Sequence, residues 1–193
     1  MVSQLIWASI LLAMNIKPVI QLGRSSGILL HITSLPSPYG IGDLGPEAFK
    51  FIDFLVETKQ KLWQILPIYQ TNSPSPYSSV SAFAGHSWLI SPDKLLESGL
   101  ISKDDLISID RSRFNQSYVH FHQVKKNREK ILKIAYLNFK NNNSQASEIL
   151  NDFFQREKYW IDDFTLFMSI KEKVTQISLL MNLFYYCISI IFG

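Results

Sequence analysis

The stretch that decides the fold is residues 27–68, GILLHITSLPSPYGIGDLGPEAFKFIDFLVETKQKLWQILPI. It holds two short apolar runs, 27–32 and 62–68, which are rich in branched side chains and bounded by Gly, Pro or Ser, as buried strands are. Between them, apolar residues recur at helical spacing after Pro46, which suits the first turn of a helix because its missing N–H costs nothing there. The stretch therefore predicts strand, helix and strand, with the helix ending near Lys59.

Short connections within this unit favour two parallel, neighbouring strands joined by a right-handed crossover. The segments that follow the strands, a first loop (33–45) and a second loop (68–85), then leave the same edge of the sheet. In (β/α) barrels and open α/β sheets this edge carries the active site. Both loops are long for such connections, and long loops are often functional. We therefore expect a site on this face.

The second half of the chain is predicted to be helical, from the spacing of its apolar residues. Residues 111–140 hold eight basic side chains and one acidic side chain. No aromatic interleaving or known motif accompanies these charges, so we interpret them as a solvated helix face rather than a nucleic-acid patch. The expected elements are a short helix over 92–98, a turn starting at 104–105, a helix ending near 141–143 and a helix over about 147–171.

The composition restricts the class of protein. The chain has 193 residues, 47% of them hydrophobic and 18% charged, which excludes a disordered chain and leaves room for one domain or slightly more. A net charge of +3 identifies no partner by itself. A single cysteine, Cys187, excludes an internal disulfide framework and any site built from several cysteines. We expect no metal and no cofactor.

The two ends of the sequence differ from the middle. Residues 1–22 carry one charge, Lys17, and no basic residue precedes their apolar run, so a signal peptide is disfavoured and Met14 is a plausible true start. Residues 174–193 carry no charge. For this tail three interpretations stay open: a buried element, a frameshifted segment, or a membrane anchor, which the lack of flanking charge disfavours.

Several side chains on or near the loops could carry chemistry. Ser75 and Tyr77 offer hydroxyl groups and an aromatic face, which suit sugar recognition, although a plain surface turn would show the same residues. His31 lies within the first strand, either as a core histidine or as a donor positioned below the site. His86 follows the second loop and is equally open to both interpretations.

Carboxylates are scarce on these loops. Asp43 is the only one in the first loop, and the second loop has none. A retaining glycosidase needs two carboxyl groups about 5–5.5 Å apart, so these two loops cannot supply that pair. No G-x-G-x-x-G pattern or G-K-[ST] pattern follows a strand, which argues against a nucleotide site.

The motifs resemble the opening of the 4-α-glucanotransferases, the family of amylomaltase and disproportionating enzyme. The resemblance covers residues 22 to 173, most of the chain, and its motifs follow in the family's order and spacing. They are RSSGILLHITSLPSPYGIGDLG at 24–45, WQILP at 63–67, SPY at 75–77, SAFAG at 81–85, LI at 89–90 and, more weakly, residues 160–171.

This resemblance implies transfer of α-1,4-glucan segments between maltooligosaccharides by a retaining double displacement. It also implies that Ser75 and Tyr77 line the subsite for the cleaved sugar, with His31 and Asp43 as weaker candidates. The family's catalytic carboxylates lie on later strands, and no position here matches them. We therefore expect no catalytic residue in this chain, and no activity from it alone.

The sequence also departs from the family. His86 stands where asparagine is usual, and Ile32 where proline is usual. The segment 69–74 is shorter than usual and lacks the Gly-Tyr-Gly often found before Ser-Pro-Tyr, which puts a secondary glucan contact there in doubt. After Lys173 the resemblance stops.

The expected fold is α/β: the N-terminal fragment of a (β/α)8 barrel, namely its first βαβ unit, with a mostly helical inserted subdomain. The predicted regions are an extension (1–22), the start of the barrel (23–91), a helical subdomain (92–173) and an apolar tail (174–193). We interpret the chain as the product of a truncated or frameshifted gene. Two alternatives stay open, a non-catalytic glucan-binding fragment that needs a complementing chain and a small membrane-associated protein. Expected partners are α-1,4-glucans, without nucleic acid, in the cytoplasm or a plastid-like compartment.

Overall fold

The computed structural model describes residues 23–175 except 72, 113, 115–116 and 143–145. The extension 1–22 and most of the apolar tail, residues 176–193, lie outside the described residues, so the expectations for them stay predictions. The elements in chain order are β1 (Gly27–Leu29), the 3-10 helix η1 (Ile32–Ser34), α2 (Pro46–Glu57), β2 (Leu62–Gln64), the 3-10 helix η2 (Ser87–Leu89), α3 (Pro92–Glu97), α4 (Lys103–Ile107), α5 (Phe121–Asn142) and α6 (Ala146–Thr175).

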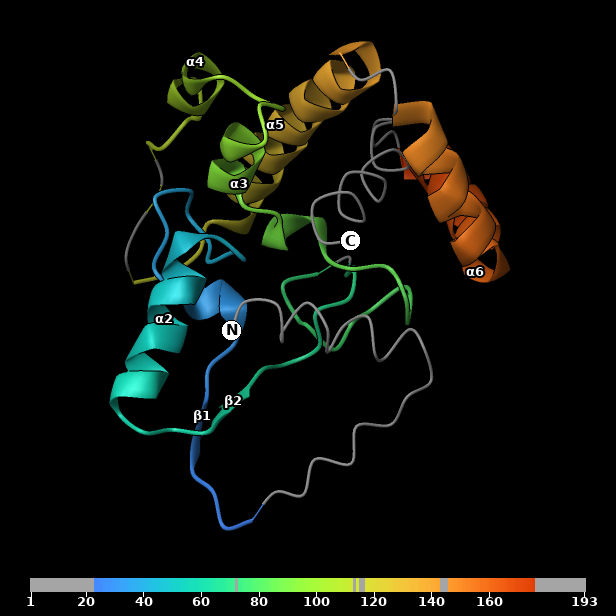
Figure 1. Cartoon of the computed structure of the whole chain (residues 1–193). Coiled ribbons are helices and arrows are strands. Elements are labelled where there is room, and N and C mark those ends of the chain that lie inside the picture. Colours follow the sequence, from blue (N-terminus) through green and yellow to red (C-terminus); the bar gives the residue numbers. More distant parts are fainter. Residues whose placement is uncertain (1–22, 72, 113, 115–116, 143–145, 176–193) are drawn as a thin grey trace.

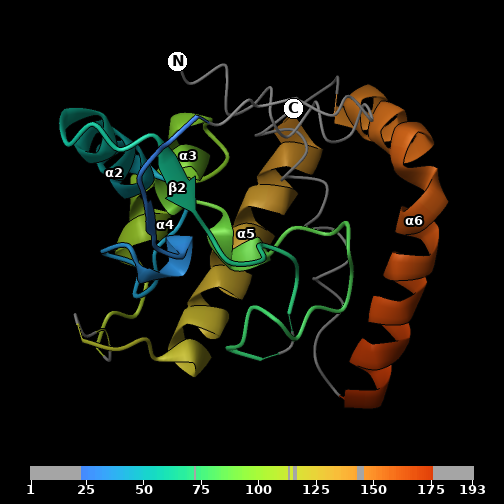
Figure 2. The same ribbon diagram turned by 90° about the horizontal axis from the view of Figure 1, so that it is seen from below.

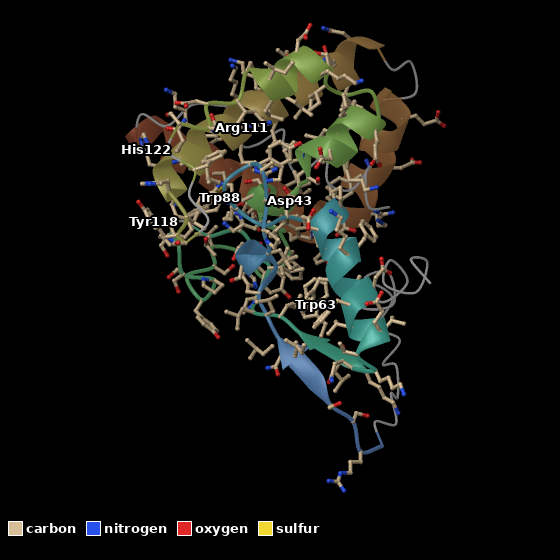
Figure 3. All side chains as sticks on the ribbon, turned by 90° about the vertical axis from the view of Figure 1, so that its left-hand side faces the viewer. Asp43, Trp63, Trp88, Arg111, Tyr118 and His122 are labelled. Atoms are coloured by element: carbon tan, nitrogen blue, oxygen red, sulfur yellow. The ribbon has the colours of Figure 1, made fainter. Side chains whose placement is uncertain are left out.

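β1, α2 and β2 form the predicted strand–helix–strand unit, and the two strands are parallel with Ile28 opposite Trp63. The Trp63 ring packs edge-on against Phe51 of α2 at 4.9 Å, and its Nε1 donates a hydrogen bond to the carbonyl oxygen of Leu30 at 2.7 Å. Figure 3 shows Trp63 on the side of the strands that α2 covers. The α/β class is therefore confirmed. Both strands are shorter than predicted. β1 ends early because the chain turns into η1 soon after Leu29, and β2 pairs with β1 only as far as Gln64.

The ends of α2 follow from the sequence. Pro46 occupies the first turn, as predicted, and Gly45 is the residue just before it. The helix ends at Glu57, and two residues later Lys59 adopts a left-handed backbone with φ of 58°. A right-handed α-helix cannot continue through a residue with a left-handed backbone, so the chain turns sharply there toward β2.

The short helix α4 begins at Lys103, one residue before the turn that Asp104 and Asp105 indicate. Ser102 caps it: the Asp105 N–H donates to Ser102 Oγ at 3.2 Å, and the Ser102 N–H donates to Asp105 Oδ2 at 2.8 Å. This reciprocal pair satisfies two backbone donors that the helix itself cannot satisfy.

One hydrophobic core joins the strand region to the helices. Tyr39 and Ile90 from the strand region pack with residues of α3, α4 and α5. Figures 1 and 2 show α5 crossing the middle of the molecule, with α2 on one side and α6 on the other. The predicted regions 23–91 and 92–173 therefore both contribute side chains to one hydrophobic core. The buried members of this core are Tyr39, Ile90, Leu95, Ile101, Leu106, Ile109, Ile131, Leu132 and Ala135.

The face of the two strands that points away from α2 is open. Leu29 is 56% exposed and Leu62 is 38% exposed, and both alternate with residues that face α2. An exposed apolar face on a parallel pair of strands is unusual, because parallel sheets are normally covered on both sides. Separately, no helix within the described ranges is long and apolar enough to cross a membrane.

Candidate functional site

The first loop folds into the interior. Asp43 is 6% exposed and forms an ion pair with Arg128 of α5, 2.6 Å from Oδ2 to Nη2. Arg128 is 3% exposed, and its Nη1 donates to the carbonyl oxygen of Ile90 at 2.5 Å. Figure 3 shows Asp43 near the centre of the molecule. The carboxylate thus ties the loop to α5 and to the segment before α3.

Burial sets the electrostatics of this junction. Burial raises the pKa of the Asp43 carboxyl above its ordinary value, and the Arg128 guanidinium opposes the rise. Tyr39 lies in the same junction: its hydroxyl donates to Asp93 Oδ1 at 2.5 Å, and its ring lies 5.7 Å from the Arg128 guanidinium. Burial, and then the bond to Asp93, raise the pKa of Tyr39. The contacts of Asp43 are those of a residue that stabilises the fold. They do not test whether Asp43 contacts a sugar, which stays a prediction.

The second loop stays on the surface and presents the predicted sugar-binding residues. Tyr77 is 72% exposed, and Ser75 is exposed as well. The Tyr77 N–H donates to Ser75 Oγ at 3.3 Å, and the Ser75 N–H donates to Ser73 Oγ at 3.2 Å. These bonds fix a tight turn and leave the tyrosine ring exposed, where it can stack on a ligand. A sugar suits this position, because its apolar C–H face can stack on the tyrosine ring and its hydroxyl groups can form hydrogen bonds.

At the base of the second loop, its two ends run antiparallel and are joined by two bridges. Tyr69 and Gly85 form an antiparallel bridge, and so do Thr71 and Ser79. Gln70, buried between them, accepts from the Ser87 N–H through Oε1 at 3.2 Å. The exposed turn therefore rests on a buried, hydrogen-bonded base.

A cavity of about 160 Å³ lies between the two loops. Pro74 and Pro76, the neighbours of Ser75, contribute to its wall, so the predicted turn borders it. His31 also lines it, and His31 Nδ1 is buried with no hydrogen-bond partner among the described residues. Burial lowers the pKa of His31. The lining residues are His31, Thr33, Ser34, Ile41, Leu66, Pro67, Ile68, Thr71, Pro74, Pro76, His86, Trp88, Leu89 and Phe121.

His86 also lines the cavity, and its side chain makes two hydrogen bonds. Its Nδ1 accepts from the Trp88 N–H at 3.3 Å, which leaves Nε2 to carry the proton and donate to Thr71 Oγ1 at 3.1 Å. Burial, and then the nearby His31, lower the pKa of His86 to about 4. The sequence left the role of His86 open, and the structure makes it a neutral residue of the cavity wall.

The structure thus brings His31 and the Ser75–Tyr77 turn to one cavity and directs Asp43 elsewhere. The sequence could not identify Arg128 as the partner of Asp43, because 85 residues separate them. Within the described residues no group of three or more His, Cys, Asp or Glu side chains could hold a metal ion. The chemistry that this face offers is hydrogen bonding and stacking.

Comparisons with known proteins identify the family of this chain. The sequence profile described as 4-alpha-glucanotransferase matches residues 30–180, which include both loops and the helices. The chain belongs to the 4-alpha-glucanotransferase family. The resemblance stated from the motifs is therefore confirmed.

Individual family members show how much is shared. The chain is 46% identical over 153 residues to the 4-alpha-glucanotransferase of Aquifex aeolicus, and 40% identical over 153 residues to that of Thermus thermophilus. Among solved structures, the amylomaltase from Streptococcus agalactiae in complex with acarbose is 47% identical and superposes with a TM-score of 0.73. Each match covers 78% of this chain, which spans about 30% of the length of these relatives.

Proposed function

We propose that this chain is the sugar-binding part of a 4-α-glucanotransferase, an enzyme that moves α-1,4-glucan segments between maltooligosaccharides, and that the described residues supply part of the sugar-binding face. In this proposal Ser75 and Tyr77 hold a glucose unit of the cleaved glucan, and His31 lies beside them on the cavity wall. The observation that carries the proposal is the exposed Ser75–Tyr77 turn, which borders the cavity between the two loops in a chain of this family.

The proposal includes the fold of the whole catalytic unit. We infer that β1, α2 and β2 form the first βαβ unit of a (β/α)8 barrel and that the helices from α3 onward belong to an inserted subdomain. The parallel register supports this, and so does the exposed face that carries Leu29 and Leu62, because a barrel interior would cover that face. The region bounds 23–91 and 92–173 and the cytoplasmic location stay predictions.

The proposal also separates sugar binding, which we assign to this chain, from cleavage of the glycosidic bond. The loops offer hydroxyl groups and an aromatic ring, and His31 and His86 line the cavity between the loops. These groups bind and orient a sugar. The one carboxylate of the first loop, Asp43, is already paired with Arg128. Breaking a glycosidic bond with retention needs two carboxyl groups that flank the bond. We therefore assign binding to this chain and expect no transfer from it alone.

Titration calorimetry with the purified chain tests the proposal. We expect maltohexaose to bind and cellohexaose, which has the same glucose units in β-1,4 linkage, not to bind. Incubation with maltotriose is expected to release no glucose and no longer maltooligosaccharides. If neither oligosaccharide binds, the sugar-binding role falls. If maltotriose is disproportionated, the assignment of the catalytic carboxylates to other residues is wrong.

A further inference from the structure

A row of hydrogen bonds leads from the half-buried His86 outward along the second loop. His86 Nε2–H donates to Thr71 Oγ1 at 3.1 Å, and the Thr71 hydroxyl in turn donates to the carbonyl oxygen of Ser73 at 2.7 Å. Thr71 is 6% exposed, which limits the competition of bulk water for these two hydrogen bonds. The two bonds connect the cavity wall to the start of the exposed turn.

From Ser73 the row continues to the residues proposed to hold sugar. Ser73 Oγ accepts from the Ser75 N–H at 3.2 Å, and Ser75 Oγ accepts from the Tyr77 N–H at 3.3 Å. The conformation of the turn therefore depends on where the Ser73 backbone is held. Its exposed part packs little, because Tyr77 lies mostly in solvent.

The inner end of the row is firmly anchored. The His86 N–H donates to the carbonyl oxygen of Ile68 at 2.8 Å, and the His86 ring packs against the Trp88 ring at 4.6 Å. Since Nδ1 is occupied by the Trp88 N–H, the ring can donate only from Nε2, toward Thr71. The donor is thus fixed in place and in direction.

We propose that His86 is a positioning residue, which acts through Thr71 to hold the Ser75–Tyr77 turn in the conformation that receives a glucose unit. The inference rests on the proposed function for its last step, the binding of sugar. Its first step, the ordering of the turn, does not depend on sugar. A fixed turn binds more tightly because less conformational freedom is lost when the ligand arrives.

Two substitutions separate this role from a general role in folding. In His86→Asn the side-chain oxygen takes the position of Nδ1 and keeps the bond to the Trp88 N–H, whereas nothing replaces Nε2. Thr71→Val keeps the shape of the threonine side chain and removes its hydroxyl group, which breaks the same row at the next atom. His122→Asn, on the first turn of α5, makes the same chemical change at an exposed residue that does not line the cavity, and serves as the control.

The readouts are the heteronuclear NOE of the Ser75 and Tyr77 amides in the free chain and the affinity for maltohexaose. We expect His86→Asn and Thr71→Val each to lower both NOE values and to weaken binding by about 3- to 10-fold, the effect of one hydrogen bond. The double variant is expected to lose no more than either single variant, because both changes break one row. His122→Asn is expected to match the wild type.

Each alternative outcome has a definite meaning. Unchanged NOE values in both variants would overturn the positioning role, whatever happens to binding. Lowered NOE values with unchanged affinity would show that the turn is held for some reason other than sugar, which also overturns the inference. If the wild type binds no maltohexaose while the NOE values still fall in the variants, the ordering step stands and the proposed function fails. Should His86→Asn not fold, Thr71→Val decides alone.

Discussion

The first and second loops are both rich in Pro, Gly and Ser and both leave the same edge of the two strands. They differ in how deeply they are buried. The first loop enters the core, where Tyr39, Ile41 and Asp43 are buried. The middle of the second loop stays on the surface and exposes Tyr77, whereas Gln70 and Ala84 near its two ends are buried. Composition alone therefore does not distinguish a loop that supports the fold from a loop that meets a ligand.

The difference lies in where the partners come from. Tyr39 and Asp43 bond to side chains 54 and 85 residues away, which ties the first loop to α3 and α5. The side-chain bonds of the second loop join residues no more than 17 positions apart. Phe83, at the end of the second loop, packs on Trp160 of α6, so this loop also has a distant partner. Its Ser75–Tyr77 turn is held by local hydrogen bonds, and a turn held in this way can change its contacts when a ligand binds.

The largest expected effect is at the buried ion pair of the first loop. Arg128→Met leaves the Asp43 carboxylate buried without its partner, and we expect the free energy of unfolding to fall by about 3–5 kcal/mol in urea denaturation followed by circular dichroism. Lys125→Met, on the same helix, breaks only the surface pair with Glu129 at 3.8 Å and is expected to cost at most about 1 kcal/mol. Equal losses in the two variants would show that the buried pair has no special role.

Glycines in the two loops give a second comparison. A Cβ added at Gly42 of the first loop would lie 2.1 Å from the carbonyl oxygen of Ile32, so Gly42→Ala is expected to cost about 2–3 kcal/mol of unfolding free energy. A Cβ at Gly85 of the second loop would meet nothing within 4 Å, and Gly85→Ala is expected to change stability by no more than about 0.5 kcal/mol. Thermal unfolding measures both. A tolerated Gly42→Ala would mean that the first loop is not tightly packed.

The neutral His86 predicts a pH dependence of smaller size. Its pKa is about 4 in the folded chain and about 6.5 when unfolded, so between these values the unfolded chain binds more protons and stability falls as the pH is lowered from 6.5 to 4. We expect His86→Asn to remove about 1–2 kcal/mol of this fall. Unfolding free energies at pH 7 and pH 4.5 give the difference. His31 titrates in the same direction and is present in both proteins. Identical pH dependence in the two proteins would show that the pKa of His86 is the same in the folded and unfolded chains.

The smallest expected effect on stability is in the exposed turn. Ser75→Ala removes a hydroxyl group that accepts a hydrogen bond from a nearby backbone group, the Tyr77 N–H. We expect a change below about 0.5 kcal/mol in the free energy of unfolding. A loss as large as that of Gly42→Ala would show that the second loop supports the fold, and the contrast between the loops would disappear.

Some of this arrangement follows from local patterns in the sequence, and some does not. The strand–helix–strand unit was predictable because apolar spacing and Pro46 act over one or two turns. The family motifs also located the Ser75–Tyr77 turn. The burial of Asp43 was not predictable, because it depends on Arg128, which another helix brings to it. The bond from His86 to Thr71 was hidden as well, since it depends on which ring nitrogen carries the proton.

The central claim is that the second loop presents Tyr77 to a sugar, and the affinity of the purified chain for maltohexaose tests it most directly. Tyr77→Ala is compared with Tyr118→Ala, which removes another exposed tyrosine, 57% exposed, outside both loops. We predict that Tyr77→Ala weakens binding by about tenfold or more, as expected for the loss of one stacked ring, while Tyr118→Ala binds like the wild type. Equal affinity of Tyr77→Ala and the wild type would contradict the account.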